Sequence, residues 1–533
     1  MERIRAAAAL TVALVCAGAL VAAANGDVRL VDAVQRHDDA AAQALVKQGV
    51  DVNAAQPDGA TALAWAAHWD DFQIADVLIR AGANVNTPND LRVTPLMLAA
   101  TNGSSMMIEK LLRAGADASS TRSSGETALM MASRSGSLDS VKLLLAAGAN
   151  VNAATERGQT ALMWAGAEKH PLIVRTLLEA GADANARTAA KKPANNNYAG
   201  RRDDEVAKGP RPVLKDNEAL NPEYRRDLLR AREGARSEGG FTPFLYAVLS
   251  GDIETARAML DGGAKINEPA ADGTTALTLA LIKLHEPLAL FLLDRGADPN
   301  AAGSGFAPLH IASATGQHKA LKGLLDRGAK PNIRLEKPVS LTEAFVTGTR
   351  VSPGAGWADI KGATPFMVAA RSVDATAMRM LLDGGADPKQ KADDGTTAVM
   401  LAAGLGKRAN ADIGYYTWDE PRAIEAIELG LKMGIDVNAA NQDGETALHA
   451  ASYHAAKSII QVLVDRGANL NATNWQNQTP LLIAQGHLIC CTTFVRHPDT
   501  AELLRKLGAD PNTGTRLNFG LGNYVDEANK PAK

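Results

Sequence analysis

The sequence predicts an all-α fold, a solenoid of stacked helix-turn-helix units joined by β-turn or hairpin loops. The first observation is a period of 33 residues, which separates Thr61, Thr94, Thr127 and Thr160, each followed by a short apolar stretch. The second is a glycine landmark 21 residues after the threonine, read as GANVN at 82 and again at 148. The third is the length of 533 residues, which is too great for one compact core. Such a period indicates supersecondary units stacked in one dimension.

The first 24 residues predict a secretory signal peptide. Arg3 and Arg5 precede an apolar run from Ala6 to Ala24, which ends in small residues before the polar Asn25. This order of basic, apolar and small residues is typical of a cleaved export signal. An uncleaved anchor is the alternative, because about 19 apolar residues can just span a bilayer. We expect an exported chain, periplasmic or secreted, that is attached to a membrane only if this segment stays uncleaved.

Residues 126–159 illustrate how the residues of one unit define its elements. Thr127 lies where an N-cap belongs and begins a first short helix. Gly136 permits the reversal, and apolar residues at three- and four-residue steps over 138–145 predict a second helix. Gly148 can adopt the left-handed conformation that ends this helix. Two helices this short are unstable alone in water, so each unit must bury its apolar face against both neighbours.

The period, with TALM or TPLM followed by GADxN, resembles that of the ankyrin repeat, over residues 27–512 and about 12 units. The resemblance implies an ankyrin-repeat solenoid with repeats 1–5 in 27–186, repeats 6–12 in 239–512 and a polar tail in 513–533. It also implies a concave face, lined by the ends of the first helices and by the turn tips, where partner proteins bind. Ankyrin arrays serve diverse partners, so the resemblance does not identify the partner.

Two histidines occupy a position of the repeat whose other occupants indicate that it is not catalytic. His310 and His449 lie three residues after the threonine position, where methionine stands in five other units. A slot in which methionine replaces histidine within one chain serves packing and not catalysis. By resemblance to ankyrin repeats, His310 and His449 are structural residues that hydrogen-bond between units.

Other polar and aromatic residues are candidate contacts with a partner protein. Position eight after the threonine is mostly polar, as a solvent-facing site should be, and by the resemblance it lies at the concave face. The alternative is that these residues are merely exposed or pack locally. The candidates are His68, Trp69, Tyr453, His454 and, in a turn, Trp475.

Insertions interrupt the period, and they are expected to form loops. The segment 187–238 has 13 basic and 9 acidic residues, which favours a solvated loop or a basic docking arm for an acidic partner. A second insertion, near 334–361, carries Phe345 and Trp357. A third, near 405–421, lies between the two helices of its unit. It contains Tyr415, Tyr416 and Trp418, which either anchor a partner or cover neighbouring repeats.

The fourth insertion, 487–497, contains the only two cysteines of the mature chain, Cys490 and Cys491, with His487 and His497. Adjacent thiols strain a tetrahedral metal site. A vicinal disulfide, or two buried thiols, is therefore favoured over bound metal.

Taken together, these features predict a non-enzymatic scaffold or adaptor that acts outside the cytoplasm and binds another protein. That partner would be periplasmic, extracellular or exposed on a membrane. The net charge of −3 gives no nucleic-acid footprint, and no enzyme motif is found, so we expect no catalytic residues, no metal ligands and no cofactor. One alternative is a carbohydrate or small-molecule binder that uses Trp357 and Trp418 as stacking platforms. Another is a hydrolase or metal-dependent enzyme whose site is built from the insertion loops, with metal ligands at His487, Cys490, Cys491 and His497.

Overall fold

The computed structural model describes residues 27–190, 239–336, 361–405, 419–489 and 493–514. Within these residues it contains 24 helices in successive pairs and two short strands. The predicted all-α solenoid of helix-turn-helix units is confirmed. The described chain divides into two compact units, one formed by residues 27–190 with 239–270 and the other by the described residues from 271 onward. None of the described helices combines the length and apolar character needed to cross a membrane.

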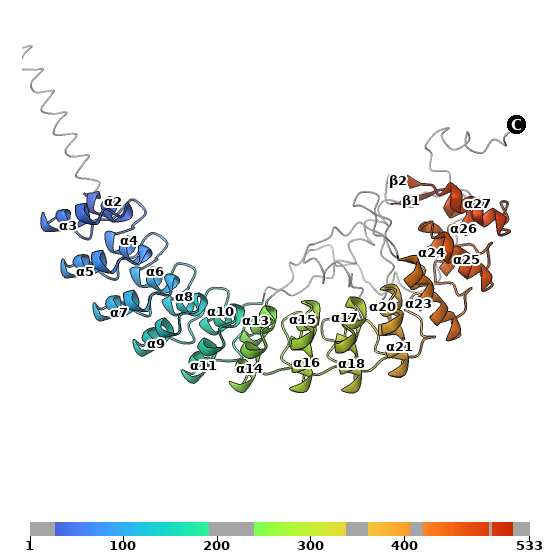
Figure 1. The fold of residues 1–533 in the computed structure, drawn as a ribbon, viewed down its shortest axis with the longest axis horizontal. Helices are drawn as coiled ribbons and strands as arrows, with labels where there is room; N and C mark the ends of the chain where they lie inside the picture. Colours follow the sequence, from blue (N-terminus) through green and yellow to red (C-terminus); the bar gives the residue numbers. More distant parts are fainter. Residues whose placement is uncertain (1–26, 191–238, 337–360, 406–418, 490–492, 515–533) are drawn as a thin grey trace, which may run out of the picture. The chain divides into compact units, whose positions relative to one another are not determined.

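Unit 1 is a stack of helix pairs, each with a first and a second helix, and Figure 1 shows consecutive pairs side by side. The pairs are α2 (Arg29–Gln35) with α3 (Asp39–Lys47), α4 (Ala62–Trp69) with α5 (Phe72–Arg80), α6 (Pro95–Asn102) with α7 (Ser105–Arg113), α8 (Ala128–Ser135) with α9 (Leu138–Ala146), α10 (Ala161–Ala167) with α11 (Pro171–Glu179), and α13 (Pro243–Ser250) with α14 (Ile253–Asp261).

Unit 2 repeats the same arrangement and adds one hairpin. Its pairs are α15 (Ala276–Ile282) with α16 (Glu286–Asp294), α17 (Pro308–Thr315) with α18 (His318–Asp326), α20 (Pro365–Arg371) with α21 (Ala375–Asp383), α22 (Ala398–Ala402) with α23 (Glu420–Lys432), α24 (Ala447–Tyr453) with α25 (Lys457–Asp465), and α26 (Pro480–Gln485) with α27 (Pro498–Lys506). The antiparallel strands β1 (His487–Ile489) and β2 (Thr493–Val495) lie between the helices of the last pair, with Leu488 opposite Phe494.

The predicted helix signals are found in the structure. Thr127 is extended, and its hydroxyl accepts a hydrogen bond from the Met130 amide at 3.3 Å, which begins α8. Gly136 has φ +82° at the reversal, and Gly148 has φ +84° after α9. Both glycines therefore adopt the left-handed conformation that other residues adopt only at a cost.

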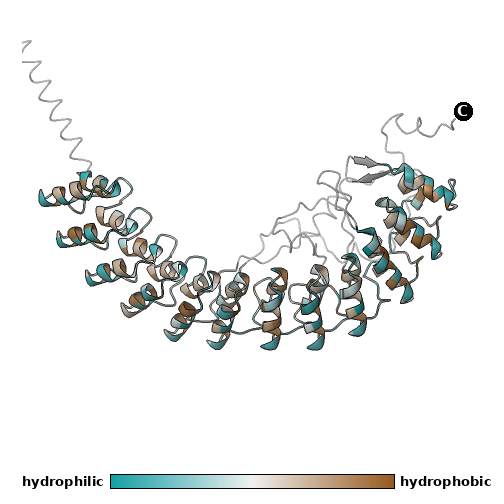
Figure 2. Ribbon diagram, in the orientation of Figure 1, coloured by the Kyte–Doolittle hydropathy of each residue, from teal (hydrophilic) through white to brown (hydrophobic). Residues whose placement is uncertain are grey.

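Small and medium apolar side chains form the core. Leu96, Met97, Ala99 and Ala100 of α6 are all at most 1% exposed. The same pattern recurs in each first helix, and Figure 2 shows hydrophobic residues along the helices and hydrophilic residues at many of their ends. Alanine at the contact positions lets neighbouring helices approach closely, which is how an aromatic-poor sequence fills its interior.

At two of the insertions, the described residues on either side are hydrogen-bonded to each other. Thr188 and Phe241 exchange hydrogen bonds, from the Thr188 amide to the Phe241 carbonyl at 3.0 Å and from the Phe241 amide to the Thr188 hydroxyl at 2.9 Å. Leu335 likewise donates to the Ala363 carbonyl at 3.0 Å. The flanking helix pairs therefore pack as ordinary neighbours, α10 against α13 and α17 against α20.

Candidate protein-binding face

The two slot histidines lie between adjacent helix pairs. His449 is fully buried, its Nδ1 accepts from the Thr446 amide at 3.2 Å, and its Nε2 donates to the Gln478 carbonyl at 3.1 Å. His310 repeats this arrangement with the Ala307 amide at 3.1 Å and the Ala363 carbonyl at 3.2 Å. Burial lowers the pKa of both imidazoles to about 4, so both rings are neutral at neutral pH. Each ring thus ties its own first helix to the following pair.

An aromatic cluster lies at the first two helix pairs, formed by His37, Trp65, His68 and Trp69. The rings of Trp65 and Trp69 stack with centroids 6.0 Å apart and an interplanar angle of 24°. The Trp69 centroid lies 4.6 Å from those of both His37 and His68. Trp69 nevertheless remains 42% exposed, and His37 and His68 are exposed as well. This N-terminal aromatic cluster therefore includes both of the contacts predicted on α4.

Four carboxylates belong to residues that directly follow His37 and Trp69 in the sequence: Asp38, Asp39, Asp70 and Asp71. Asp38 and Asp71 cap α3 and α5, and each accepts a hydrogen bond from a backbone amide, Ala41 and Ile74 respectively, at 2.9 Å. Asp39 begins α3, and Asp70 follows Trp69 in the left-handed conformation with φ +61°. Burial, together with the nearby carboxylate of Asp71, raises the pKa of Asp39. Among the residues the structure describes, no lysine or arginine lies within ion-pair distance of these four carboxylates.

A second aromatic site lies further along the first helices of unit 1. A hollow of about 190 Å³ is lined by residues of α8, α10 and α13 and by the turn before α10. The Arg134 guanidinium lies 5.8 Å from the Trp164 ring centroid and 3.7 Å from Glu168. The Gln159 amide donates to the Tyr246 hydroxyl at 3.2 Å, which fixes the tyrosine ring at the edge of this hollow.

Sequence reasoning missed Trp65, Trp164 and Tyr246. All three stand four residues after the threonine, in a slot held elsewhere by Leu98, Met131 and other aliphatic residues. All three are half-buried and so present part of a ring on the first-helix side. Comparing this slot across units, as was done for the histidine slot, would have found them.

The predicted contacts in unit 2 have partners within the chain. Tyr453 is half-buried, and its hydroxyl donates to Glu445 Oε1 at 3.1 Å. His454 is half-buried as well and bonds through Nε2 to the Gly404 carbonyl at 3.1 Å. Trp475 is half-buried and its amide donates to the Asp443 carbonyl at 2.7 Å. These three side chains offer a partner less free surface than Trp69 does.

The buried carboxyl of Glu445 anchors this part of unit 2. Its Oε1 also accepts from the Asn474 side-chain amide at 2.9 Å, whereas its Oε2 is buried without a hydrogen-bond partner among the described residues. Burial raises the pKa of Glu445 to about 7, and the charge of Asp443 adds to this effect. The carboxyl is therefore partly protonated at neutral pH.

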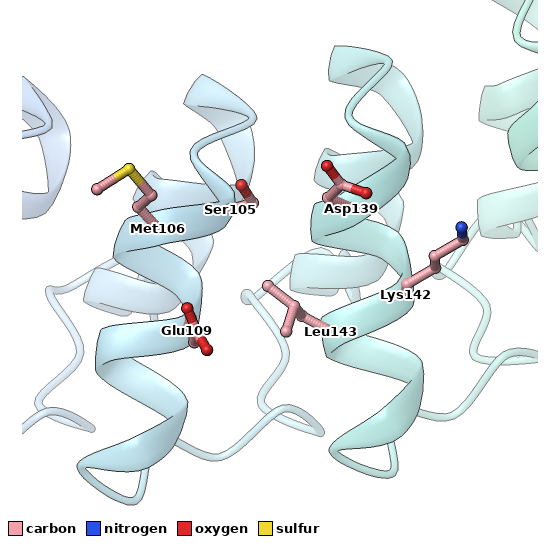
Figure 3. A pocket seen from close by; sticks show the side chains of 6 residues that line it. All are labelled: Ser105, Met106, Glu109, Asp139, Lys142 and Leu143. Atoms are coloured by element: carbon pink, nitrogen blue, oxygen red, sulfur yellow. The ribbon is translucent and has the colours of Figure 1, made fainter.

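Two second helices of unit 1, α7 and α9, form a hollow of about 300 Å³, which Figure 3 shows at close range. Ser105, Met106 and Glu109 line it from α7, and Asp139, Lys142 and Leu143 line it from α9. Lys142 points away from the space between the helices. The hollow is open, and the polar side chains labelled in Figure 3 do not converge on one position, so we assign it no ligand.

Several predicted residues lie outside the described part of the chain: Tyr415, Tyr416, Trp418, Trp357, Phe345, Cys490 and Cys491. The N-terminal segment and most of the 187–238 insertion also lie outside it. Within the residues that the structure does describe, no group of three or more His, Cys, Asp or Glu side chains is placed to hold a metal ion. His497, a predicted ligand in the enzyme alternative, is half-buried, and burial lowers its pKa.

Comparison with known proteins identifies the repeat. A family model described as ankyrin repeats (3 copies) matches residues 30–122, 96–188, 223–303, 244–334 and 421–515, more than half of the chain.

Individual relatives are more distant. The B-cell lymphoma 3 protein homolog of Mus musculus is 25% identical over 257 residues, 47% of this chain and 50% of that protein. Ankyrin repeat and SOCS box protein 16 of Mus musculus is 26% identical over 223 residues, 40% of this chain and 48% of that protein. SH3 and multiple ankyrin repeat domains protein 2 of Homo sapiens is 27% identical over 220 residues, 36% of this chain and 10% of that protein. The chain thus spans at most about half the length of these curated relatives.

Proposed function

This chain belongs to the ankyrin-repeat family, and from that premise we propose that it is a non-enzymatic scaffold or adaptor that binds another protein. The helix pairs of the described residues support an array of about twelve repeats. Its relatives include proteins named for their ankyrin repeats beside other domains, which supports a role in bringing proteins together. A stack of this kind offers side chains from many repeats to one partner, so binding is spread over several contacts.

The observation that carries the proposal is the placement of aromatic side chains on the first helices of unit 1. Trp69 and the half-buried Trp65, Trp164 and Tyr246 all belong to α4, α10 or α13. Tryptophan and tyrosine supply large contact areas at modest entropic cost and dominate protein interfaces. We therefore assign the partner to the first-helix face of unit 1, with Tyr453, His454 and Trp475 as subsidiary contacts in unit 2.

We further propose that the protein acts outside the cytoplasm, as a periplasmic or secreted molecule. The sequence of its first 24 residues supports export, with Arg3 and Arg5 before the apolar run. Its partner would then be periplasmic, extracellular or exposed on a membrane. The test is to express the full chain in its native cells, fractionate them and determine the N-terminal residue of the purified protein by mass spectrometry. A mature N-terminus near Asn25 in the exported fraction supports this proposal, whereas an intact Met1 in the cytoplasm refutes it.

Binding can be tested with a matched pair of variants. The tagged full chain is purified from its native compartment, and its partner is identified and then titrated against both variants. The first-helix variant carries Trp69→Ala, Trp164→Ala and Tyr246→Ala. The second-helix control carries Met106→Ala and Leu172→Ala, which remove side chains that are 65% and 60% exposed. We expect the first-helix variant to bind at least about 100-fold more weakly, because hot-spot aromatics each contribute 1 kcal/mol or more. Equal weakening by both variants, or by neither, would refute the first-helix assignment.

A further inference from the structure

We propose that the N-terminal aromatic cluster binds an arginine side chain presented by a basic segment of the partner protein. The inference rests on the proposed function and adds the chemistry of one contact to it. It uses His37, Trp65, His68 and Trp69 together with the four carboxylates at the ends of the same two turns.

The exposed ring of Trp69 supplies the platform. It is held by its stack on Trp65 and by His37 and His68, whose ring centroids each lie 4.6 Å away. Because three neighbouring rings fix its orientation, Trp69 loses little rotamer freedom on binding. A tryptophan face attracts a cation through its quadrupole, and a planar guanidinium can also stack on it.

The four carboxylates make the site negatively charged. Asp38, Asp39, Asp70 and Asp71 all lie within two residues of His37 or Trp69 in the sequence. Asp39 and Asp71 are close enough to repel each other, and no described lysine or arginine pairs with any of the four. A guanidinium near these carboxylates would relieve that repulsion while its plane lies on Trp69. A carboxylate from a partner would increase the repulsion between the aspartates, so an acidic segment does not suit this site.

The chain itself contains an arginine in this role. At the second aromatic site Arg134 lies over Trp164 and beside Glu168, and it stands seven residues after the N-cap of its helix. In the first helix pair the N-cap is Val28, so the same slot holds Gln35. Gln35 accepts a hydrogen bond from Gln56, which in turn accepts one from the Trp65 indole at 3.0 Å. The N-terminal cluster therefore has tryptophans and carboxylates without the arginine, and the partner is the source that completes it.

The test uses the full chain and a fluorescein-labelled hexa-arginine peptide, titrated by fluorescence anisotropy at low salt. We expect Trp69→Ala to weaken binding about tenfold, and Trp69→Phe, which keeps a ring, to weaken it less. The double variant Asp39→Asn with Asp71→Asn keeps a capping side chain on α5 but removes two charges, and it should also weaken binding. Leu172→Ala, which removes another exposed apolar side chain on α11, should bind as the unaltered chain does.

Two further peptides decide the chemistry. Hexa-lysine should bind several-fold more weakly than hexa-arginine, because an ammonium lacks the planar face that stacks on tryptophan. Hexa-glutamate should not bind. Equal binding of the arginine and lysine peptides, or hexa-arginine binding that Trp69→Ala leaves unchanged, would overturn the inference.

The same variants separate this inference from the proposed function. If the natural partner still needs Trp164 and Tyr246 but ignores Trp69→Ala and the Asp39 and Asp71 changes, the arginine site is wrong and the first-helix face stands. If no first-helix variant affects the partner, the proposed function itself fails at this face.

Discussion

His449 shows how one side chain can serve packing and still respond to pH. It is fully buried and hydrogen-bonded on both ring nitrogens, with its pKa lowered from 6.5 to about 4. The stability that this neutral ring contributes is complete above pH 6.5 and is lost as the pH falls toward 4, because the unfolded state then binds a proton more readily.

The corresponding prediction concerns His449→Met, the residue that fills this slot at Met130 and Met400. We expect the contribution of His449 to the free energy of unfolding to fall by up to about 3 kcal/mol between pH 6.5 and 4, at about 1.4 kcal/mol per pKa unit, and the buried His310 adds a fall of its own. His449→Met should remove the part of the pH dependence of the unfolding free energy that His449 contributes. Urea titrations at several pH values within that window measure it, and a slope unchanged by the substitution would contradict the account.

Glu445 should give the opposite dependence. Its folded-state pKa of about 7 lies above the ordinary 4.5, so its contribution is complete below pH 4.5 and is lost as the pH rises through 7. Glu445→Gln keeps the shape without the charge, and it should remove a decline on the order of 3 kcal/mol at most between pH 5 and 8. Glu126→Gln, in the same slot of unit 1 but half-buried, is the control. Identical pH profiles of unit 2 with and without Glu445→Gln would be evidence against this.

Single slots also show what the sequence could reveal about the candidate site. Trp69 and His68 were found because their position is polar in other repeats. Trp164 and Tyr246 were missed because only a comparison of their slot across repeats, where it is otherwise aliphatic, sets these two rings apart. Tyr453 and His454 were placed in the polar class, but their bonds to Glu445 and Gly404 join residues 8 and 50 positions apart, which the local sequence pattern does not encode.

Between elements, an asparagine ladder joins successive repeats. The Asn152 side chain donates to the Gly181 carbonyl at 3.0 Å and accepts from the Asp183 amide at 2.8 Å. This bridge recurs along both units, at Asn53, Asn86, Asn185, Asn300, Asn332 and Asn438. Ser119 occupies the same place in another repeat, and its shorter side chain makes no such bridge among the described contacts.

Two reciprocal substitutions test the ladder. We expect Asn152→Ala to lower the free energy of unfolding of unit 1 by about 1–2 kcal/mol, because a carbonyl and an amide lose their partner. Ser119→Asn should raise it by about 1 kcal/mol by completing the ladder. Chemical denaturation followed by circular dichroism measures both. If Ser119→Asn has no effect or destabilises the unit, the asparagines do not couple repeats in the proposed way.

The reversal between the two helices of a pair needs a left-handed residue. Glycine fills it at Gly136 and Gly316, but Leu284 has φ +59° at the same place in α15–α16. We expect Leu284→Gly to raise the free energy of unfolding by about 0.5–1 kcal/mol, since relief of strain exceeds the entropic cost of glycine. The reverse change, Gly316→Ala, should cost about 1 kcal/mol, because its Cβ would meet only Asp374 Oδ2, at 3.6 Å, and backbone strain alone remains. Thermal unfolding of the two variants should therefore shift in opposite directions.

At the scale of the whole molecule, the sequence predicted most of the fold. Thr127, Gly136 and Gly148 marked the elements of one unit because each performs a local backbone task. Two features were not predicted. The β1–β2 hairpin pairs Leu488 with Phe494 inside a segment that has no period. The division at residue 270 depends on packing summed over many residues, to which no single motif corresponds.

The hydrogen bonds at the ends of the two long insertions let the repeats on either side pack in register whatever the length of sequence between them. Thr188 and Phe241 are already hydrogen-bonded to each other, as are Leu335 and Ala363, so flexible sequence added between the residues of either pair should cost only a slowly growing closure entropy. A reporter domain or an affinity tag spliced between Ala190 and Gly239 should leave the packing of α10 on α13 intact. Foreign sequence can thus be inserted at these two sites without any change to the repeats on either side.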